Sequence, residues 1–471
     1  MRELILRGGP YTEQQQNDIL DYCESDVIGL DSLLPKMLPL IDVPRAIARG
    51  AYIIEIARIE DRGVPVDVPR LETIRARRDE LILHLVSQHR HIDVYEGTTF
   101  DQKKFEAFLV KNGLAERWRR TATGLYKSDD SYFEEMGQVY PLIEELRQLK
   151  KIVLQLQRDR FQAGADGRAR CPLWPFSSIT GRNQPSAGKE QKDGIRSESP
   201  YVFGLPKPLR FLIQGAPEMA LAYLDWEQQE FAIAAYLSGD KEMIRAYKSG
   251  NPHLALGKKL GAVPESATKD SHSVEHEKFK AVVLGVNYDR TKYGLSKMLA
   301  LPVHECAKLL QGYWKTFSTY AQWRKTVRVL MFGYGRLWVW DGWRCLLGVK
   351  PNHRAVGNWP VQSTGAVLLR LAIMLAARKG VRIIAPVHDA IMIEARDEDI
   401  EEHVRLAREA MDEACRAVLG DVIRTDCQII RAGERYFDKK GKKLWDVVCD
   451  FMGWEQPQSD ELEKTGHRVS S

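Results

Sequence analysis

The chain of 471 residues is long enough for a large apolar core and too long for one simple domain, so about two to four subdomains are expected. Its formal net charge of +5 permits a nucleic-acid partner without establishing one. The seven cysteines are scattered and lack any C-x-x-C spacing, which argues against a disulfide framework or a structural zinc site and favours a reducing compartment.

The first 92 residues are predicted to be helical. One short helix is expected within residues 13–38, and one or two long helices within 41–92, with a break at "DRGVPVDVPR". The N-terminus has no signal-peptide core, and no run approaches the roughly 20 apolar residues of a membrane span. We therefore expect a soluble intracellular protein without a membrane partner.

Residues 140–162 are strongly helical in pattern. The apolar stripe, with three- and four-residue steps, consists of Leu142, Leu146, Leu149 and Val153. The basic remainder consists of Arg147, Lys150, Lys151, Arg158 and Arg160. This basic face is interpreted either as a solvated helix surface or as a surface that tracks phosphates.

The rest of the chain alternates strands with helices. A polar loop (183–200) precedes a strand running into a helix (219–240), a mostly helical stretch (241–345), a helix (361–379), the hairpin "PVHDAIMIEA", and a helix from about 397 to 418. Strands interleaved with long helices predict a helix-rich mixed α/β (α+β) fold, in which helical lobes surround a catalytic layer.

Two aspartates stand where apolar strands end. Asp225 follows "ALAYL", and Asp389 lies at the tip of the hairpin. If both strands belong to one sheet, the carboxylates repel each other, and a cation or a shared proton must relieve the repulsion. Magnesium suits such a pair, because it takes a few carboxylates and leaves positions for phosphate oxygens and water. The alternative is that each aspartate is a helix cap or a turn residue, and Asp225 is well placed for N-capping.

A helix between the two aspartates carries a row of residues spaced by four. The row consists of His276, Lys280, Leu284 and Tyr288. These residue types suit a nucleoside triphosphate, since cations bind phosphates and apolar or aromatic surface accepts a base. The alternative is an ordinary amphipathic helix whose lysine is solvated.

Several segments resemble, in the same order, the motifs of family A DNA polymerases, the bacterial DNA polymerase I type. "DWEQQEFAIAAYLSGD" resembles the first carboxylate motif, and "HEKFKAVVLGVNYDRTKYG" the nucleotide-binding helix R-x-x-x-K-x-x-x-F-G-x-x-Y-G. "NWPVQSTGAVLLRLAI" and "VHDAIMIE" resemble the later palm helix and the second carboxylate motif, and "TGRNQPS" the start of the palm. The similarity runs from about residue 10 to the end. The residues of these motifs resemble those of phage or prophage members of the family.

The resemblance implies a right-hand architecture with an antiparallel palm sheet and helical fingers and thumb. The implied divisions are an exonuclease-like remnant (1–40), linker and thumb (41–172), the first part of the palm (173–240), fingers (241–345) and the second part of the palm (346–471). The implied partners are primer–template DNA and deoxynucleoside triphosphates. The implied protein is a monomer on DNA, in the cytoplasm of a prokaryotic or phage-infected cell.

The resemblance also implies roles for individual residues. Asp225 and Asp389 would hold two Mg²⁺ ions, for which Mn²⁺ would substitute, and Lys280 would contact the triphosphate and protonate the pyrophosphate. The implied nucleotide site consists of Gln228, Glu230, His253, His276, Lys280, Leu284 and Tyr288. Within this site, Glu230 would close the pocket against a ribose 2′-hydroxyl. The implied DNA contacts are Arg182, Arg354, Asn358, Gln362 and His388.

Five positions depart from the family pattern. They are His276 for the usual Arg, Leu284 for Phe, Asp289 for Gly, Ala390 for the Glu after the second aspartate, and Ala232 for Arg. These departures keep open a catalytically weak, polymerase-derived DNA-binding protein. A single-subunit RNA polymerase on the same palm is a further alternative, against which the bulky Glu230 argues.

The segment "YCESD", from Tyr22 to Asp26, resembles the last motif of a 3′–5′ exonuclease, Y-x-x-x-D on a helix. The 21 residues before it contain no D-x-E strand to complete a nuclease site. We therefore expect a remnant without proofreading, either in a truncated product or in one half of a split polymerase whose exonuclease is a separate chain.

Overall fold

The computed structural model describes residues 1–89, 91–137, 139–158, 160–186, 200–348 and 353–456. The chain forms two compact units, Met1–Ile54 and Glu55–Ser471. The division falls inside helix α3 (Val43–Arg62).

The N-terminal unit is helical. It contains α1 (Arg2–Arg7), α2 (Glu13–Met37), the 3₁₀ turn η1 (Leu38–Leu40) and the start of α3. A capping box opens α2: the Thr12 side chain accepts from the Gln15 backbone N–H, and the Gln15 side chain accepts from the Thr12 N–H. The predicted helix over residues 13–38 is confirmed as α2, although at 25 residues it is long rather than short, and α1 was not predicted.

The second unit is organised around a four-stranded antiparallel sheet with the order β10-β5-β9-β8. Its strands are β5 (Met219–Trp226), β8 (Arg382–Val387), β9 (Ala390–Arg396) and β10 (Thr425–Ile430). The central strand β5 pairs on both sides with strands from later in the chain: Asp225 lies opposite Ala390 of β9 and opposite Asp426 of β10. The predicted hairpin is therefore confirmed, whereas β10 was not predicted.

Helices α16 (His353–Arg378) and α17 (Ile400–Leu419) pack on this sheet. Helix α9 (Gln229–Ser238) packs against α16, and α18 (Lys442–Met452) packs against η4 (Lys207–Leu212). The short turns η3 (Val202–Gly204) and η5 (Asp397–Asp399) precede η4 and α17. Helix α16 begins earlier than the predicted residue 361. Its segment Val356–Arg378 is long and apolar enough to cross a membrane, contrary to the expectation that no run approaches that length, but it is mostly buried inside the structure, as in a core helix.

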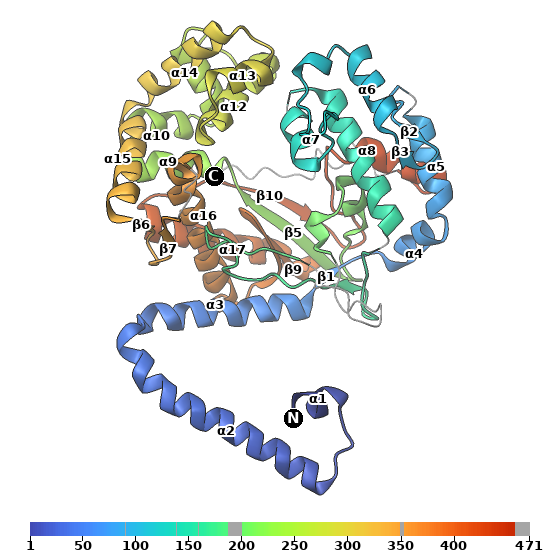
Figure 1. Cartoon of the computed structure of the whole chain (residues 1–471), viewed down its shortest axis with the longest axis vertical. Coiled ribbons are helices and arrows are strands. Elements are labelled where there is room, and N and C mark those ends of the chain that lie inside the picture. Colours follow the sequence, from blue (N-terminus) through green and yellow to red (C-terminus); the bar gives the residue numbers. More distant parts are fainter. Residues whose placement is uncertain (90, 138, 159, 187–199, 349–352, 457–471) are drawn as a thin grey trace. The chain divides into compact units, whose positions relative to one another are not determined.

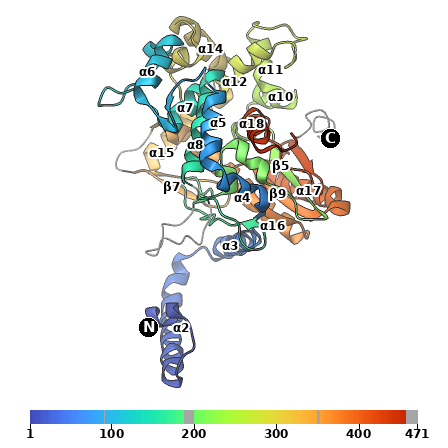
Figure 2. The ribbon, with the colours of Figure 1, turned by 90° about the vertical axis from the view of Figure 1, so that its right-hand side faces the viewer.

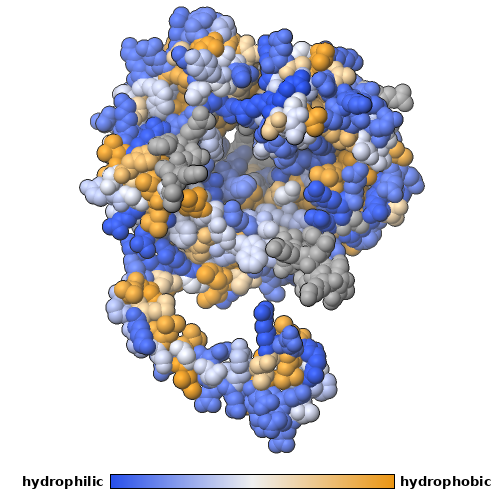
Figure 3. Space-filling model, in the orientation of Figure 1, coloured by the Kyte–Doolittle hydropathy of each residue, from blue (hydrophilic) through white to orange (hydrophobic). Residues whose placement is uncertain are grey.

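Two helical lobes rise from the same side of the sheet (Figures 1 and 2). The first lobe contains α4 (Val68–Ala76), α5 (Arg78–Gln88), α6 (Gln102–Lys111), η2 (Ala115–Arg117), α7 (Asp130–Gly137), α8 (Pro141–Arg158), and the pair β2 (Tyr95–Glu96) with β3 (Thr99–Phe100). The pair β1 (Val64–Pro65) with β4 (Arg168–Ala169) lies beside the sheet instead (Figure 1), where Arg168 pairs with Glu394 of β9 at 3.0 Å. The second lobe contains α10 (Lys241–Lys248), α11 (Pro252–Lys259), α12 (Ser273–Asn287), α13 (Lys292–Leu299), α14 (Val303–Thr316), α15 (Ser318–Tyr334), β6 (Arg336–Trp338) and β7 (Arg344–Leu346). Figure 3 shows a hollow between the lobes, bordered by hydrophilic residues. The helix-rich mixed α/β prediction is confirmed.

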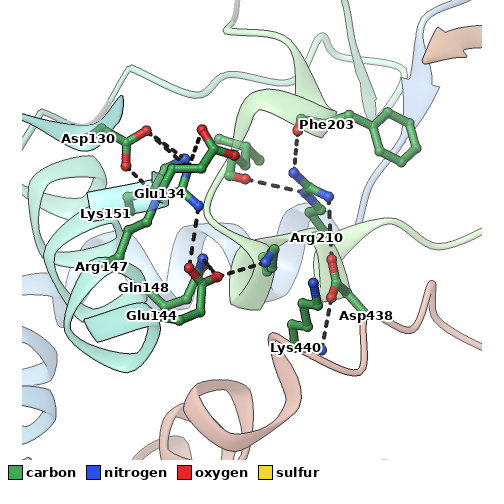
Figure 4. Close-up of polar contacts among 12 residues, drawn as sticks. Asp130, Glu134, Glu144, Arg147, Gln148, Lys151, Phe203, Arg210, Asp438 and Lys440 are labelled. Atoms are coloured by element: carbon green, nitrogen blue, oxygen red, sulfur yellow. Dashed lines mark hydrogen bonds and ion pairs between the residues drawn. The ribbon is translucent and has the colours of Figure 1, made fainter. Parts of the chain in front are cut away.

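Helix α8 buries its apolar stripe in the first lobe, but its basic face is also partly used inside the protein. Arg147 is buried and its guanidinium lies 2.8 Å from Asp130, 3.3 Å from Glu134 and 3.4 Å from Glu144 (Figure 4). Glu144 in turn pairs with Lys207 of η4 at 2.9 Å. Arg147 is therefore neither solvated nor free to bind a phosphate. The successive ion pairs Arg147–Glu144 and Glu144–Lys207 connect the first lobe to η4 at the base of the sheet.

Candidate active site

Asp225 and Asp389 lie side by side at one end of the sheet. Asp225 is near the end of β5, Asp389 is in the turn between β8 and β9, and the backbone N–H of Trp226 donates to the Asp389 carbonyl at 3.2 Å. The two strands are neighbours in one sheet, as the metal hypothesis requires. Asp225 is not a helix cap, because the N-cap of α9 is Gln228, in a left-handed conformation with φ of 51°.

The surroundings of this pair are unfavourable to negative charge. Burial raises the pKa of Asp225 to about 8, and the charges of Asp389, Asp426 and Glu227 add to the shift. Burial also raises the pKa of Asp389, against the opposing influence of His388 and Arg182. Among the residues the structure describes, no cation forms an ion pair with either aspartate. Two such carboxylates suit a divalent cation, which would remove the repulsion.

Asp426 is a third carboxylate, which sequence reasoning missed. It is directly opposite Asp225 across the β5–β10 pair, so the two side chains share a face of the sheet. The sequence signal that could have revealed this strand and its aspartate was the short pattern "TDCQII" after the last predicted helix. Across the described ranges, no three or more His, Cys, Asp or Glu side chains are grouped to hold a metal ion, so Asp426 acts here as an electrostatic neighbour of the pair.

The loop that carries Arg182 is fixed to α16 by hydrogen bonds from three side chains. Trp359 Nε1 donates to the Ile179 carbonyl at 2.9 Å, and Ser363 Oγ donates to the Thr180 carbonyl at 3.0 Å. Arg370 Nη1 donates to the carbonyl of residue 181 at 2.7 Å. These bonds hold the backbone of Arg182 beside the aspartates.

Four of the predicted site residues meet in one polar group. The Tyr288 hydroxyl donates to Glu230 Oε1 at 3.3 Å and accepts from Gln362 Nε2 at 3.3 Å. Arg182 Nη2 lies 3.9 Å from the same Glu230 oxygen. The group joins a loop, the first turn of α9, the C-terminal end of α12 and helix α16.

The two predicted histidines are buried rather than aimed at solvent. His253 and His276 form a T-shaped ring contact with centroids 5.4 Å apart, and His276 Nδ1 lies 3.1 Å from Glu277 Oε1. Burial lowers the pKa of His276, and it lowers the pKa of His253 to about 4. Both rings are therefore neutral at pH 7, and Lys280, half-exposed with Nζ 3.3 Å from Glu277 Oε2, is the cation of the predicted row.

The remaining predicted residues are dispersed. Leu284 is half-buried on α12, Asn358 is buried with no hydrogen-bond partner among the described residues, and His388 is exposed. Arg354 belongs to α16, but its side chain lies outside the described residues. Within the described ranges, neither Lys280 nor His388 forms a hydrogen bond or ion pair with Asp225 or Asp389.

A cavity of about 350 Å³ opens between the two lobes beside Tyr288. It is lined by Arg119, Glu135, Tyr288, Arg290, Thr291, Tyr293, Gly294 and Lys297. Arg290 Nη1 of the second lobe lies 2.8 Å from Glu135 Oε1 of the first, with both side chains about one-quarter exposed. This ion pair, the interlobe bridge, spans the hollow between the lobes.

The comparisons with known proteins agree with this geometry. The sequence model of "DNA polymerase family A" matches residues 72–430. The chain is 26% identical over 444 residues to DNA polymerase I of Aquifex aeolicus, covering 86% of this chain and 73% of that protein. It is 25% identical over 379 residues to the thermostable DNA polymerase I of Thermus aquaticus, covering 76% of this chain but 44% of that protein.

A solved structure shows the same fold. The POL domain of Pol1 from M. smegmatis, in complex with DNA primer-template and dNTP, aligns with a TM-score of 0.63 and 20% sequence identity. The alignment covers 85% of this chain and 70% of that one.

Proposed function

The chain belongs to DNA polymerase family A, a family of DNA-directed DNA polymerases, and we propose that it adds deoxynucleotides to the 3′ end of a primer paired with a DNA template. The observation that carries this proposal is the pairing of Asp225 with Asp389 at the end of the sheet, next to the Glu230–Tyr288 group. The similar Pol1 domain of M. smegmatis is in complex with primer-template DNA and dNTP, which supports the same partners here. In this proposal, residues 173–240 and 346–471 form the palm, 241–345 the fingers and 41–172 the linker and thumb.

Asp225 and Asp389 would hold two Mg²⁺ ions, for which Mn²⁺ would substitute. Their half-buried, mutually repelling carboxylates lack a cation partner among the described residues, and this fits a divalent ion. When bound, the ions would activate the primer hydroxyl and stabilise charge on the transferred phosphate.

The side chains around the pair have separate roles in the proposal. Glu230, hydrogen-bonded by the Tyr288 hydroxyl, forms a wall that leaves no room for a ribose 2′-hydroxyl. Lys280, as the charged residue of its row, binds the triphosphate and supplies a proton to the leaving pyrophosphate. His276 takes part as a neutral residue, because its burial disfavours the charged imidazolium.

Primer extension by single-aspartate variants tests the metal assignment. Asp225→Ala and Asp389→Ala are each expected to lower the extension rate by at least about 10³-fold, while primer–template binding persists. Asp426→Asn, on the same edge of the sheet, is the matched control and is expected to lose less than about tenfold. Near-normal extension by either alanine variant would refute the assignment.

A catalytically weak DNA-binding protein is the second candidate, and the neutral His276 favours it. Such a protein would bind primer–template and fail to extend it at any Mg²⁺ or Mn²⁺ concentration. Parallel reactions with ribonucleotides separate an RNA polymerase from the proposed activity.

We also propose that the exonuclease-like remnant, residues 1–40, does not proofread. Tyr22 and Asp26 both lie on α2, and the 21 residues before Tyr22 contain no D-x-E segment to complete a nuclease site. Loss of a labelled primer 3′ end that Asp26→Ala abolishes would overturn this proposal. A separate exonuclease chain and a phage-like origin stay predictions from the sequence.

A further inference from the structure

The residue directly after Tyr288 has a backbone conformation that side chains rarely adopt. Asp289 has φ of 51°, in the left-handed region that favours glycine, and the family pattern has Gly at this position. Aspartate tolerates this conformation better than most residues, but it places a carboxylate at the C-terminal end of α12, where the helix dipole disfavours negative charge. A carboxylate here needs partners that offset this cost.

Two arginines of α15 supply those partners. Arg324 Nη2 lies 3.0 Å from Asp289 Oδ2, and Arg328 Nη2 donates to the same oxygen. Arg324 is 2% exposed, so its positive charge is almost fully removed from water. A buried guanidinium of this kind is strongly destabilising unless a carboxylate neutralises it.

Arg324 also completes the end of α12. Its Nη1 donates to the Val286 carbonyl at 2.8 Å, and its Nη2 reaches the Asn287 carbonyl at 3.5 Å. The last carbonyls of a helix have no partner within the helix, and a cation there is favourable. One side chain of α15 therefore caps α12 and pairs with the residue that follows its C-terminal end.

Helix α16 leaves room for this cluster. A Cβ atom at Gly357 would lie 2.6 Å from Arg324 Nη2 and 3.2 Å from Arg328 Nη2, so a larger residue would displace both guanidinium groups. The same helix carries Gln362, which donates to the Tyr288 hydroxyl. Helices α12, α15 and α16 therefore meet at the C-terminal end of α12, next to Tyr288.

Tyr288 itself has little packing to hold it, since 51% of the residue is exposed. Its position against Glu230 depends on two hydrogen bonds of its hydroxyl, to Glu230 and from Gln362, each 3.3 Å long, and on where the end of α12 places its backbone. We propose that Asp289, Arg324 and Arg328 form a positioning cluster that holds Tyr288 against Glu230 and thereby sets the discrimination between deoxyribonucleotides and ribonucleotides. This inference rests on the proposed polymerase function.

The test compares Asp289→Asn, Arg324→Met and the double variant in the full chain. Asp289→Asn keeps a side chain that tolerates the left-handed conformation but removes the charge. It is expected to lower the melting temperature by at least about 3 °C, because Arg324 is left buried without its carboxylate. It is also expected to lower the selectivity for dNTP over rNTP, measured as the ratio of kcat/KM values, by about fivefold or more.

The double variant separates positioning from stability. With Asp289 and Arg324 both neutral, the melting temperature is expected to rise above that of Asp289→Asn, because the fully buried guanidinium is no longer left unpaired. It is expected to stay below the wild type, because the α12 carbonyls have lost the Arg324 donor and Arg328 has lost its carboxylate. The selectivity is expected to stay low, because the end of α12 has lost its anchor. Glu242→Gln, which removes a carboxylate from an ion pair on the surface of the same lobe, is the control and is expected to leave both quantities unchanged.

Hydrogen exchange of residues 284–292 in the DNA-free protein tests the inference independently of catalysis. Asp289→Asn is expected to speed this exchange at least about threefold, because the anchored end of α12 opens more often. A wild-type chain that does not extend primers would refute the proposed function, while faster exchange in the variant would still support the cluster as an anchor. Unchanged selectivity in an active Asp289→Asn variant, or unchanged exchange, would overturn the inference.

Discussion

At the scale of single residues, the second lobe has a neutral histidine, His276, where the family pattern has a positively charged arginine. His276 and His253 pack against each other, and burial lowers the pKa of both rings. The folded protein therefore prefers them neutral, and the triphosphate in the proposed site depends on Lys280 for charge. A preference for neutral histidine also makes stability depend on pH.

His253 is expected to contribute to acid sensitivity between about pH 6.5 and pH 4. Its pKa falls from an ordinary value near 6.5 to about 4 on folding, so in this range the unfolded chain binds more protons. Stability from this residue is complete above pH 6.5 and is lost as the pH falls through that range. His253→Gln is expected to reduce the loss of unfolding free energy between pH 7 and pH 4.5 by about 1–3 kcal/mol, measured by urea titration.

The exposed His304 of the same lobe provides the control. His304→Gln is expected to leave the pH dependence of stability unchanged. If His253→Gln and wild type lost the same free energy between the two pH values, the assignment to this buried ring would be wrong.

At the scale of elements, α8 shows how a helix can use both its apolar and its basic face inside the protein. Its apolar residues are buried in the first lobe, and Arg147 joins α8 to α7 through Asp130 and Glu134. The pairing partners are half-exposed, so water partly solvates them, but the guanidinium itself is not solvated. The stability of the α7–α8 pair should therefore depend on this one side chain.

Arg147→Met is expected to lower the free energy of unfolding by about 1–3 kcal/mol. The substitution keeps most of the apolar stem and leaves the surrounding carboxylates without their cation. Lys151→Met removes a cation from the same helix and the same Asp130, in a half-exposed pair 3.5 Å long, and is expected to cost less than about 1 kcal/mol. Equal costs for the two variants in denaturant titrations would contradict the role given to Arg147.

Local patterns predicted those elements whose residues bury a face. The run "MALAYLDW" and the hairpin around Asp389 are apolar enough to be recognised as strands, and the helix after Asp225 follows from its sequence. Strand β10 escaped prediction because "TDCQII" is short and half-polar. Helix α2 was predicted over nearly its whole length, although its residues bury no face in the described structure.

Long-range contacts set the rest of the site, and no local pattern contains them. The carbonyls of residues 179–181 accept from side chains of α16 that lie 180 or more positions later in the sequence. The ion pairs of Asp289 with Arg324 and Arg328 likewise join the end of α12 to α15. The sequence therefore showed that Asp289 replaces the glycine of the family pattern, but not which side chains pair with it.

At the scale of the second unit, the interlobe bridge between Arg290 and Glu135 spans the hollow in which DNA would bind. If a duplex enters between the lobes, as the proposed function implies, we expect this pair to separate. The separation would then belong to the association of DNA and not to the chemical step.

Breaking the bridge from either side is expected to speed the association of primer–template by about twofold or more, in stopped-flow measurements at fixed salt. Glu135→Gln removes a negative charge and Arg290→Gln a positive one, so their general effects on attraction to DNA have opposite signs. If both variants associate with primer–template faster than the wild type, the acceleration is caused by breaking the bridge. Acceleration by Glu135→Gln with slowing by Arg290→Gln would assign the effect to net charge alone.

The order of strands in the sheet has a consequence for how the protein is made. Strand β5 is central, yet its partners β9 and β10 are translated much later. At about 5–20 residues per second, roughly 10–40 s separate the synthesis of Asp225 from that of Asp426. Until β9 is synthesised, the nascent chain presents an apolar strand with two unsatisfied edges, and the edge that pairs with β10 stays unsatisfied for the whole interval. Its safe emergence from the ribosome therefore calls for chaperone protection or temporary shielding by earlier segments.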